Sequence, residues 1–331
     1  ERRMNDELKF TVISDTHYYS KKNFVDGFDK NKKPKPGQLF FSRSEEIVEH
    51  TFDCLCKNDT PDIVLISGDL TYNGERTSHD EMKAALKKLQ QKGKRVYVIT
   101  ATHDYTTPRM PTYGIDKNDK YIEVESVNRT QLLKYYGDFG YNNAIAKHKS
   151  TMSYVAQLAD GYRLFALNDD YGDPDCGFSD ELMNWVKTEA NNAKRDGQYI
   201  IAMTHHPLVP PSPIYAAVAK GDMLNEYELR RNQLSDLGFD FVLTGHTHMH
   251  NISYCKIGNK KFYDISTAAL TGFPPYYRQI VLNKEQKKAE IKTICADCAD
   301  SIDTNGLALE EYTKDLFLGV VSKALYDAEY D

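Results

Sequence analysis

Six short apolar runs recur along the chain, and each is bounded by polar or glycine-containing segments. Runs of this length, rich in Val, Ile, Leu and Phe, are typical of strands that are buried on both faces of a sheet. The six predicted strands are Phe10 to Ile13, Ile63 to Ile66, Val96 to Ile99, Tyr162 to Leu167, Tyr199 to Met203 and Phe239 to Leu243.

Four segments between or after these strands have the spacing of amphipathic helices. Ile47, Val48 and Leu55 share one face of the first, and Asp180 and Glu181 favour the first turn of the third. The predicted helices are Ser44 to Cys56, His79 to Gln91, Ser179 to Ala193 and Glu226 to Leu237. This strand-to-helix rhythm predicts an α/β layer architecture.

The pattern changes after Asn251, where apolar positions alternate across turn signals such as Gly258-Asn259. We predict an antiparallel meander that completes the core, with strands at Asn251 to Ile257, Lys261 to Ile265, Arg278 to Leu282 and Ala289 to Ile294. Beyond Asp303 the apolar residues return to helical spacing. The expected organisation is one domain over residues 1–303, followed by a C-terminal amphipathic helix at 304–331 that docks on it or begins a further helical region.

One long segment, at about residues 105–150, is rich in Tyr, Asn and Lys and only weakly periodic. It is too long for an ordinary connection, so we predict a functional lid or a small helical insertion. Its tyrosines, such as Tyr135, Tyr136 and Tyr141, either wall a substrate cleft or pack as amphipathic surface residues.

Composition narrows the class of protein. The 331 residues are 40% hydrophobic and 27% charged, which is typical of a soluble globular chain. No run approaches the roughly 18 apolar residues of a membrane helix. The net charge of −6 argues against nucleic acid as a partner, because phosphate-backbone binding requires a concentrated positive field. We interpret the basic cluster from Lys30 to Lys35 as a solvated loop.

The N-terminus and the cysteines leave the compartment open. The chain begins at Glu1 without an initiator Met, which fits a trimmed or processed form, so an exported or cell-envelope protein whose signal has been removed remains an alternative. Cys295 and Cys298 form a single C-x-x-C without a second pair at zinc spacing, and the six cysteines would allow 15 disulfide pairings.

Polar clusters follow four of the predicted strands directly. They are Asp15-Thr16-His17, Gly68-Asp69, His205-His206 and Gly245-His246-Thr247-His248. In α/β sheets the crevice beyond the carboxyl ends of the strands is where ligands bind. We therefore expect these clusters to converge on one site.

The residue types in these clusters indicate a metal site. Carboxylate and imidazole are ligands of Zn, Mn and Fe. In D-x-H and H-x-H the two donors lie on the same side of an extended chain, so two such motifs can hold one ion, and Asp69 is free to bridge to a second. A lone His at a strand end is usually a hydrogen-bonded or surface residue, but His17, His103, His205, His246 and His248 all follow apolar strands.

The ordered set D-x-H, G-D, H-D, H-H-P and G-H-T-H, from Asp15 to His248, resembles the calcineurin-like metallophosphoesterase family, which includes purple acid phosphatases and bacterial cyclic-nucleotide phosphodiesterases. The resemblance implies a two-sheet β-sandwich flanked by helices and a dinuclear site of Mn, Fe or Zn. It implies that the first ion is held by Asp15, His17 and His248, that Asp69 bridges, and that His205 and His246 hold the second.

The same resemblance assigns the chemistry of the H-D pair. His103 would contact the phosphate and protonate the leaving oxygen, and Asp104 would orient its imidazole. A hydroxide that bridges the two ions would attack phosphorus, so no protein nucleophile is needed, and the chain has no G-x-S-x-G and no P-loop.

The chain departs from the family pattern at Ala101 and Thr102, where Gly and a metal-binding Asn are usual. Thr102 would be a weaker or water-mediated ligand of the second ion. Ala in place of Gly would cost about 1 kcal/mol if the backbone there needed a positive φ.

We therefore predict a metal-dependent phosphoesterase that acts on a small phosphoester, with a phosphodiesterase of the cyclic-nucleotide type favoured. Arg278 is a candidate substrate contact or, alternatively, a structural residue of a strand. The alternative function is a weakly active or inactive metal- or phosphate-binding relative, since Thr102 replaces the usual Asn. A nuclease on the same scaffold is disfavoured by the acidic charge.

Overall fold

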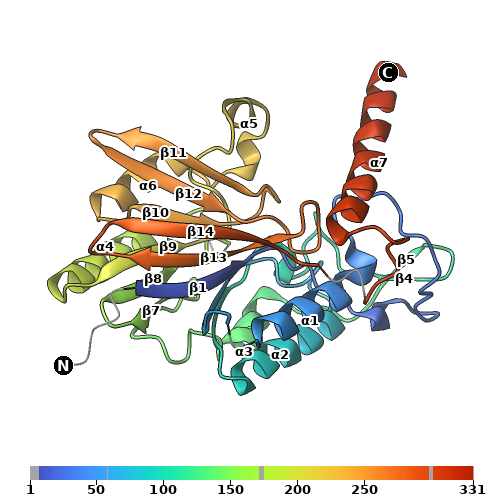
Figure 1. The fold of residues 1–331 in the computed structure, drawn as a ribbon, viewed down its shortest axis with the longest axis horizontal. Helices are drawn as coiled ribbons and strands as arrows, with labels where there is room; N and C mark the ends of the chain where they lie inside the picture. Colours follow the sequence, from blue (N-terminus) through green and yellow to red (C-terminus); the bar gives the residue numbers. More distant parts are fainter. Residues whose placement is uncertain (1–6, 58, 171–174, 298–300, 331) are drawn as a thin grey trace.

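Two β-sheets packed face to face form the centre of the molecule, and helices cover both outer faces (Figure 1). The computed structural model describes residues 7–57, 59–170, 175–297 and 301–330. The predicted two-sheet sandwich flanked by helices is confirmed.

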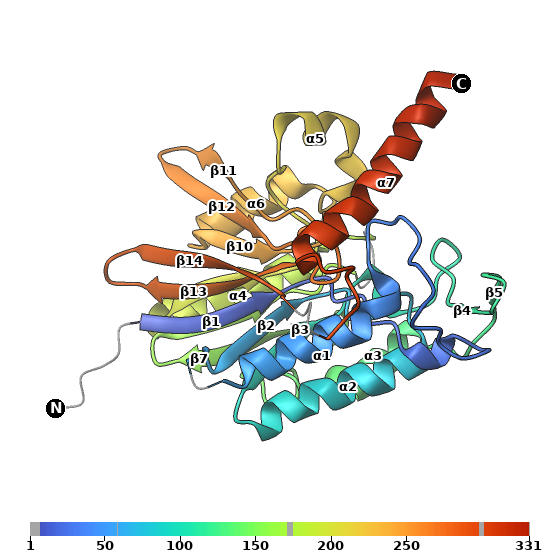
Figure 2. The same ribbon diagram turned by 45° about the vertical axis from the view of Figure 1, so that its right-hand side comes forward.

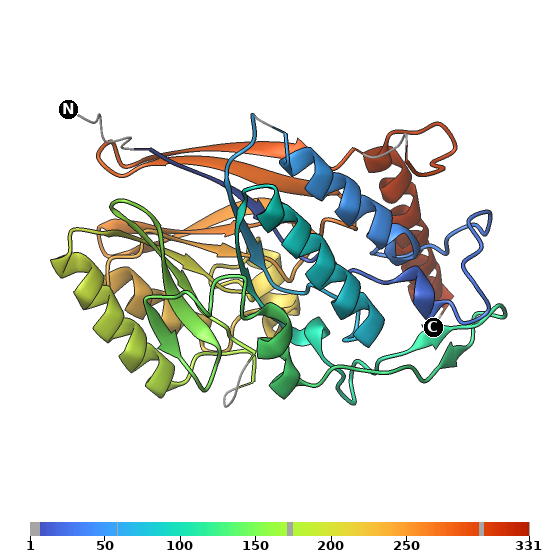
Figure 3. The ribbon, with the colours of Figure 1, turned by 90° about the horizontal axis from the view of Figure 1, so that it is seen from below.

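The first sheet has five strands in the order β14-β13-β1-β2-β3. Its three parallel strands are β1 (Glu7–Ile13), β2 (Ile63–Ser67) and β3 (Arg95–Ile99), and β13 (Tyr276–Asn283) and β14 (Lys288–Cys295) extend it antiparallel. Helices α1 (Ser44–Leu55), α2 (Arg76–Gln91) and α3 (Leu132–Tyr136) pack on its outer face. Figure 3 shows α1 and α2, in blue and cyan, side by side.

The second sheet has seven strands in the order β11-β12-β10-β9-β8-β7-β6. The strands are β6 (Ala146–His148), β7 (Ser153–Ala159), β8 (Tyr162–Ala166), β9 (Tyr199–Met203), β10 (Phe241–Thr244), β11 (Asn251–Ile257) and β12 (Lys260–Ser266). Strands β8, β9, β10 and β12 are parallel neighbours. Helices α4 (Asp180–Arg195) and α6 (Tyr227–Asp236) cover its outer face.

The core of the sandwich follows from the two-residue period of the strands. In β1, Leu8, Phe10 and Val12 point between the sheets, and in β8, Leu164 does so while Phe165 packs under the helices. Both faces of the central strands are therefore apolar, which explains why the sequence shows them as continuous apolar runs.

The remaining elements lie in connections and at the C-terminus. The helix α7 (Leu309–Tyr330) projects away from the two sheets, as both Figure 1 and Figure 2 show. The short elements are α5 (Pro213–Val218), β4 (Gly114–Ile115), β5 (Tyr121–Ile122), η1 (Lys21–Asn23), η2 (Phe41–Arg43), η3 (Thr102–Asp104), η4 (Arg129–Gln131) and η5 (Lys220–Asp222). None of the helices in the described ranges is long and apolar enough to span a membrane.

The predicted antiparallel meander is wrong in its connectivity. Its four strands form two hairpins in different sheets, since β11 and β12 pair in the second sheet and β13 and β14 pair in the first. The alternation of apolar and polar residues along each strand predicts the hairpins, but it does not determine to which sheet a hairpin belongs. The division at residue 303 stays a prediction.

The 105–150 segment has only short elements of regular structure, and its role as a lid stays a prediction. It contains the β4–β5 hairpin, α3 and the edge strand β6. Tyr135, Tyr136 and Tyr141 are at most 8% exposed and belong to the hydrophobic cores, so the prediction that they wall a substrate cleft was wrong. Cys298 lies outside the described residues, and the other five cysteines are free thiols.

Candidate metal centre

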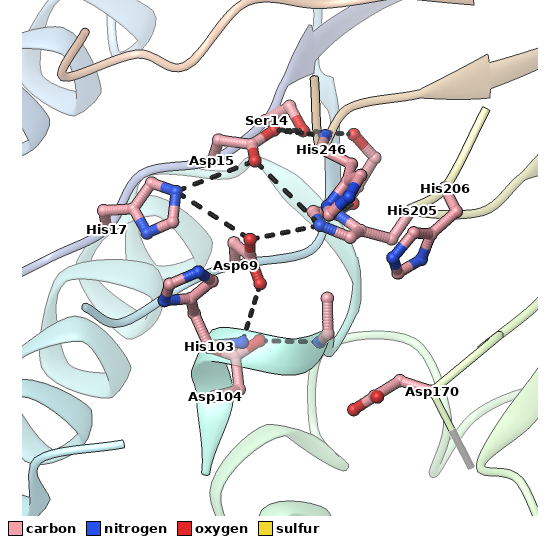
Figure 4. A network of polar contacts seen from close by, with 12 residues as sticks. Ser14, Asp15, His17, Asp69, His103, Asp104, Asp170, His205, His206 and His246 are labelled. Carbon is pink, nitrogen blue, oxygen red and sulfur yellow. Dashed lines mark hydrogen bonds and ion pairs between the residues drawn. The ribbon is translucent and has the colours of Figure 1, made fainter. Parts of the chain in front are cut away.

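The four predicted polar clusters meet at one edge of the sandwich. Asp15 follows β1, Asp69 follows β2, His205 follows β9 and His246 follows β10. These strands run parallel within their own sheets, so their carboxyl ends open on the same crevice. Figure 4 shows the side chains of these residues, together with His17, turned toward one another.

A first donor group consists of Asp15, His17 and His248. The Nε2 atoms of the two imidazoles are 3.1 Å apart, and Asp15 Oδ1 lies 3.7 Å from His17 Nε2 and 3.4 Å from His248 Nε2. Three donors at these separations can bind one cation.

A second donor group consists of Asp69, His205 and His246. Asp69 Oδ2 is 3.1 Å from His205 Nε2 and 3.8 Å from His17 Nε2, so this one oxygen faces both donor groups. The position is the one that a bridging carboxylate needs.

Each carboxylate presents one oxygen to the site and has the other held by the protein. Asp15 Oδ2 accepts hydrogen bonds from the Ser14 hydroxyl and, at 3.1 Å, from the His246 N–H. Asp69 Oδ1 accepts from the His103 N–H at 2.9 Å. The free oxygens, Asp15 Oδ1 and Asp69 Oδ2, are thereby aimed at the imidazoles.

The backbone is strained at five of the six predicted ligands. Positive φ angles occur at Asp15 (51°), His17 (38°), Asp69 (50°), His246 (65°) and His248 (57°). Left-handed non-glycine residues are uncommon, and they concentrate at functional sites because the surrounding structure must impose them. The strain indicates that the fold holds these side chains in place for a purpose other than stability.

Two glycines let the loops approach one another here. A Cβ on Gly245 would overlap the Ser14 hydroxyl and lie 2.3 Å from Asp15 Oδ2. Gly68 has a φ of +102°, and a Cβ there would lie 2.7 Å from His205 Nδ1. Side chains at either position would displace a predicted ligand.

The protonation states suit metal binding at two of the histidines. Burial lowers the pKa of His17 to about 4, against the hydrogen bond with Asp15 that raises it, so the imidazole is neutral at pH 7. Burial also lowers the pKa of His246. His205 Nδ1 lies 2.8 Å from the Ser67 carbonyl oxygen, so Nδ1 carries the hydrogen and donates to that oxygen. The other nitrogen, Nε2, is then the atom that can bind a metal ion.

The donors fit a pair of cations, because two of the atoms that face the site are buried without a hydrogen bond. Among the described residues, these atoms are Asp15 Oδ1 and His205 Nε2. Orphaned polar atoms in a buried site are costly, and two carboxylates that face several imidazoles offer a donor set for Zn, Mn or Fe.

Ala101 and Thr102 stand on the turn that holds Asp69. Ala101 has a φ of −146°, which is extended backbone that any residue adopts. The conformational free-energy cost of having Ala in place of Gly therefore does not arise. Thr102 opens the helix η3, directly before the His103 N–H that binds Asp69. A ligand role for its hydroxyl stays a prediction.

The predicted orienting role of Asp104 is not what the structure shows. Its carboxylate accepts from the backbone of Thr71 and Ala101, at 2.9 and 2.8 Å, and so ties two loops together. The His103 imidazole is held elsewhere, since Nδ1 lies 2.6 Å from the Tyr72 carbonyl and 2.8 Å from Asn73 Oδ1. Two oxygen acceptors require an N–H at Nδ1, which leaves Nε2 for a ligand.

Glu75 supports this loop and gives a prediction about pH. Its carboxylate is fully buried and accepts from the Asn73 N–H at 3.2 Å, and burial raises its pKa from 4.5 to about 7. Between pH 4.5 and about pH 7, Glu75 is ionised in the unfolded chain but still protonated in the folded chain. The free energy of unfolding therefore falls as the pH rises through this range. At pH 8 we expect the free energy of unfolding of Glu75→Gln to exceed that of the wild type by up to about 3 kcal/mol. At about pH 4.5 the two free energies should differ little.

Urea unfolding at both pH values measures this difference. Glu123→Gln is the control, because Glu123 is an exposed glutamate of the 105–150 insertion. Equal pH dependence in Glu75→Gln and the wild type would contradict the prediction.

Asp169 is a site residue that the sequence reasoning missed. Its Oδ2 accepts from the backbone N–H groups of His205 and His206, at 3.1 and 2.7 Å, and from the Thr204 hydroxyl at 2.8 Å. Burial lowers the pKa of His206 while Asp169 raises it, with a net pKa of about 10. The signal was present, since Asn168-Asp169-Asp170 directly follows a predicted strand.

Arg278 connects the two sheets. It lies on β13, is 2% exposed, and donates from Nη2 to the carbonyls of Asn251 and Ser266 at 3.1 and 2.7 Å. These bonds match the structural alternative, and a substrate contact stays a prediction.

Buried His and Asp residues beyond the strand ends of a two-sheet sandwich are the donor set expected of a metal-dependent hydrolase. The model of the calcineurin-like phosphoesterase family matches residues 8–250. The chain belongs to the calcineurin-like phosphoesterase family, and this family typically binds a dinuclear metal centre and hydrolyses phosphoesters. No match was found among curated protein sequences.

One solved structure supports the fold, and a second is more distant. A dimetal phosphatase from Danio rerio superposes with a TM-score of 0.56 at 12% identity, over 87% of this chain and 99% of that chain. A sulfate thiohydrolase from Thermus thermophilus gives a TM-score of 0.44 at 10% identity, over 95% of this chain and 60% of that chain.

Proposed function

We propose that this protein is a phosphodiesterase that uses two metal ions of the Mn, Fe or Zn type. The observation that carries the proposal is the convergence of six His and Asp donors in two groups, with Asp69 Oδ2 lying 3.8 Å from His17 Nε2 of one group and 3.1 Å from His205 Nε2 of the other. Asp15, His17 and His248 would hold one ion, His205 and His246 the other, and Asp69 both.

When bound, two such ions lower the pKa of a water molecule and stabilise the attacking and leaving oxygens of an in-line displacement at phosphorus. The residues of the chain then have two tasks. The turn at Thr102 and His103 fixes the bridging carboxylate through the His103 N–H. The His103 imidazole, held at Nδ1 by Tyr72 and Asn73, offers Nε2 to protonate the leaving oxygen.

The charge around the donors favours a diester. Within the described part of the chain, the hydrogen bonds and ion pairs of the two donor groups involve His, Asp, Ser, Thr and backbone groups and no Lys or Arg. The phosphate of a diester carries one negative charge. The phosphate of a monoester dianion carries a second negative charge, which a Lys or Arg side chain would stabilise.

A substrate comparison tests the proposal. Protein reconstituted with Mn, Fe or Zn should hydrolyse bis(p-nitrophenyl) phosphate with a higher kcat/KM than p-nitrophenyl phosphate. A higher kcat/KM for the monoester would contradict the diesterase assignment, and tight binding of metal without any hydrolysis would favour the inactive relative.

Thr102→Asn tests whether position 102 faces the second ion. An amide oxygen is a better and longer-reaching donor than a hydroxyl, so we expect the variant to bind the second ion about tenfold more tightly, the scale of a single added ligand contact. Metal titration followed by calorimetry measures this affinity. Thr130→Asn, in the exposed helix η4, is the control, and an unchanged second affinity in Thr102→Asn would show that residue 102 is not at the ligand position.

A further inference from the structure

A cavity of about 480 Å³ opens between the segment that precedes α1 and the 105–150 insertion. Small-molecule sites of this size are common. Seven of the side chains that line it are aromatic, and we call the cavity they form the aromatic pocket: Phe24, Phe28, Phe40, Phe41, Tyr72, Tyr113 and Tyr121.

Tyr72 joins the aromatic pocket to the metal centre. Its ring lines the pocket and contacts the ring of His17 edge-on, with 6.3 Å between centroids. Its carbonyl oxygen accepts from His103 Nδ1 at 2.6 Å. When the phosphate of a substrate lies at the donor groups, the alcohol portion of that substrate can therefore reach the aromatic pocket.

The tyrosines of the insertion are arranged for stacking. The rings of Tyr113 and Tyr121 are 4.2 Å apart, and Tyr121 is 71% exposed on the β4–β5 hairpin. The Tyr113 hydroxyl lies 3.5 Å from the Tyr72 hydroxyl, so polar groups are available for the edge of a bound ring. A large aromatic side chain left in water next to a cavity is a feature of binding sites.

The two walls of the pocket are fixed to each other. The Val25 N–H donates to the Ile115 carbonyl at 2.9 Å, and the Tyr19 hydroxyl donates to the Tyr113 carbonyl at 3.1 Å. Figure 2 shows the β4–β5 hairpin beside the blue segment that precedes α1. Because the walls are already in contact, a ligand would not have to order them on binding.

The charges at the rim nearly cancel, because five basic and four acidic side chains line the cavity. Among them, Lys32 and Lys35 form ion pairs with Asp119, and Arg43 pairs with Glu46 at 3.0 Å. The basic cluster is solvated, as predicted, but it also lines the cavity. The pocket thus presents aromatic ring surfaces and little net charge to a ligand. Such a lining suits an uncharged planar group.

We propose that the aromatic pocket binds a planar aromatic ring of nucleobase type, carried on the alcohol portion of the phosphoester that is hydrolysed at the metal centre. This inference rests on the proposed function for its substrate, but the pocket is argued from its own residues. Base stacking on aromatic side chains tolerates any base, so the ring should add affinity without strict base specificity.

Calorimetric binding to the metal-loaded protein tests the proposal with two probes that differ only in the base. We expect adenosine 5′-monophosphate to bind about tenfold or more tightly than ribose 5-phosphate, the scale of one stacked base. Tyr113→Ala should abolish this preference, and Tyr121→Ala should reduce it without affecting the fold, since that ring is mostly exposed. Tyr254→Ala is the matched control, because Tyr254 is 52% exposed and stacks on Tyr263 away from the pocket.

The outcomes separate this proposal from the proposed function when diester hydrolysis is recorded with the same samples. Equal binding of the two probes, or a preference that survives in both Tyr113→Ala and Tyr121→Ala, would overturn the pocket assignment even if diesters are hydrolysed. A preference for the base that Tyr113→Ala removes supports the pocket even if no diester is hydrolysed, a result that would contradict the proposed function alone.

Discussion

Asp69→Asn is expected to abolish both metal binding and hydrolysis. The substitution keeps the shape of the side chain and an oxygen that can accept from the His103 N–H, but it removes the negative charge at the one oxygen that faces both donor groups. Metal ions supply several kcal/mol of transition-state stabilisation, so their loss should lower kcat/KM roughly thousandfold or more.

Metal analysis of the dialysed variant, together with the rate on bis(p-nitrophenyl) phosphate, measures the effect. Asp240→Asn is a suitable control, because Asp240 is an exposed aspartate that accepts from the Tyr199 hydroxyl. Two ions per chain in Asp69→Asn, with a near-normal rate, would show that Asp69 does not bridge.

His103→Gln is expected to retain the metal ions and lose turnover, by about 10²- to 10⁴-fold for a substrate with an alkoxide leaving group. The reason is that the imidazole lies outside the proposed ligand set, with Nδ1 held by Tyr72 and Asn73 and Nε2 available as an acid. The loss should be much smaller with bis(p-nitrophenyl) phosphate, because p-nitrophenolate leaves without being protonated.

The ratio of the two losses distinguishes proton transfer from a general disturbance of the site. A cyclic nucleotide and bis(p-nitrophenyl) phosphate provide the two leaving groups, and His50→Gln, on α1, is the control. Equal losses for both substrates would mean that His103 positions the phosphate and does not protonate the leaving oxygen.

The sequence predicted the central strands and the convergence of the polar clusters, for a physical reason. Strands buried on both faces appear as apolar runs, and ligands that follow such strands must meet at one edge of a sheet. Asp15, His17, Asp69, His205, His246 and His248 were found in this way, and the structure brings them together.

What the sequence could not predict depends on contacts between distant segments. The strand β7 was missed, although most residues of Ser153–Ala159 are apolar and buried, because it directly follows the irregular insertion. Asp104 was assigned to His103 by resemblance, but hydrogen bonds with Thr71 and Ala101 take its carboxylate. The aromatic pocket could not be predicted either, since Phe41 and Tyr113 meet only through tertiary packing of two segments.

The most direct test of a two-ion phosphodiesterase is titration of the metal-free protein with Mn, Fe or Zn while bis(p-nitrophenyl) phosphate hydrolysis and bound metal are followed together. We predict no hydrolysis in the metal-free protein and a rate that reaches its maximum only when two ions are bound per chain. Full hydrolysis by the metal-free protein, or a maximum reached with one ion bound, would contradict this account.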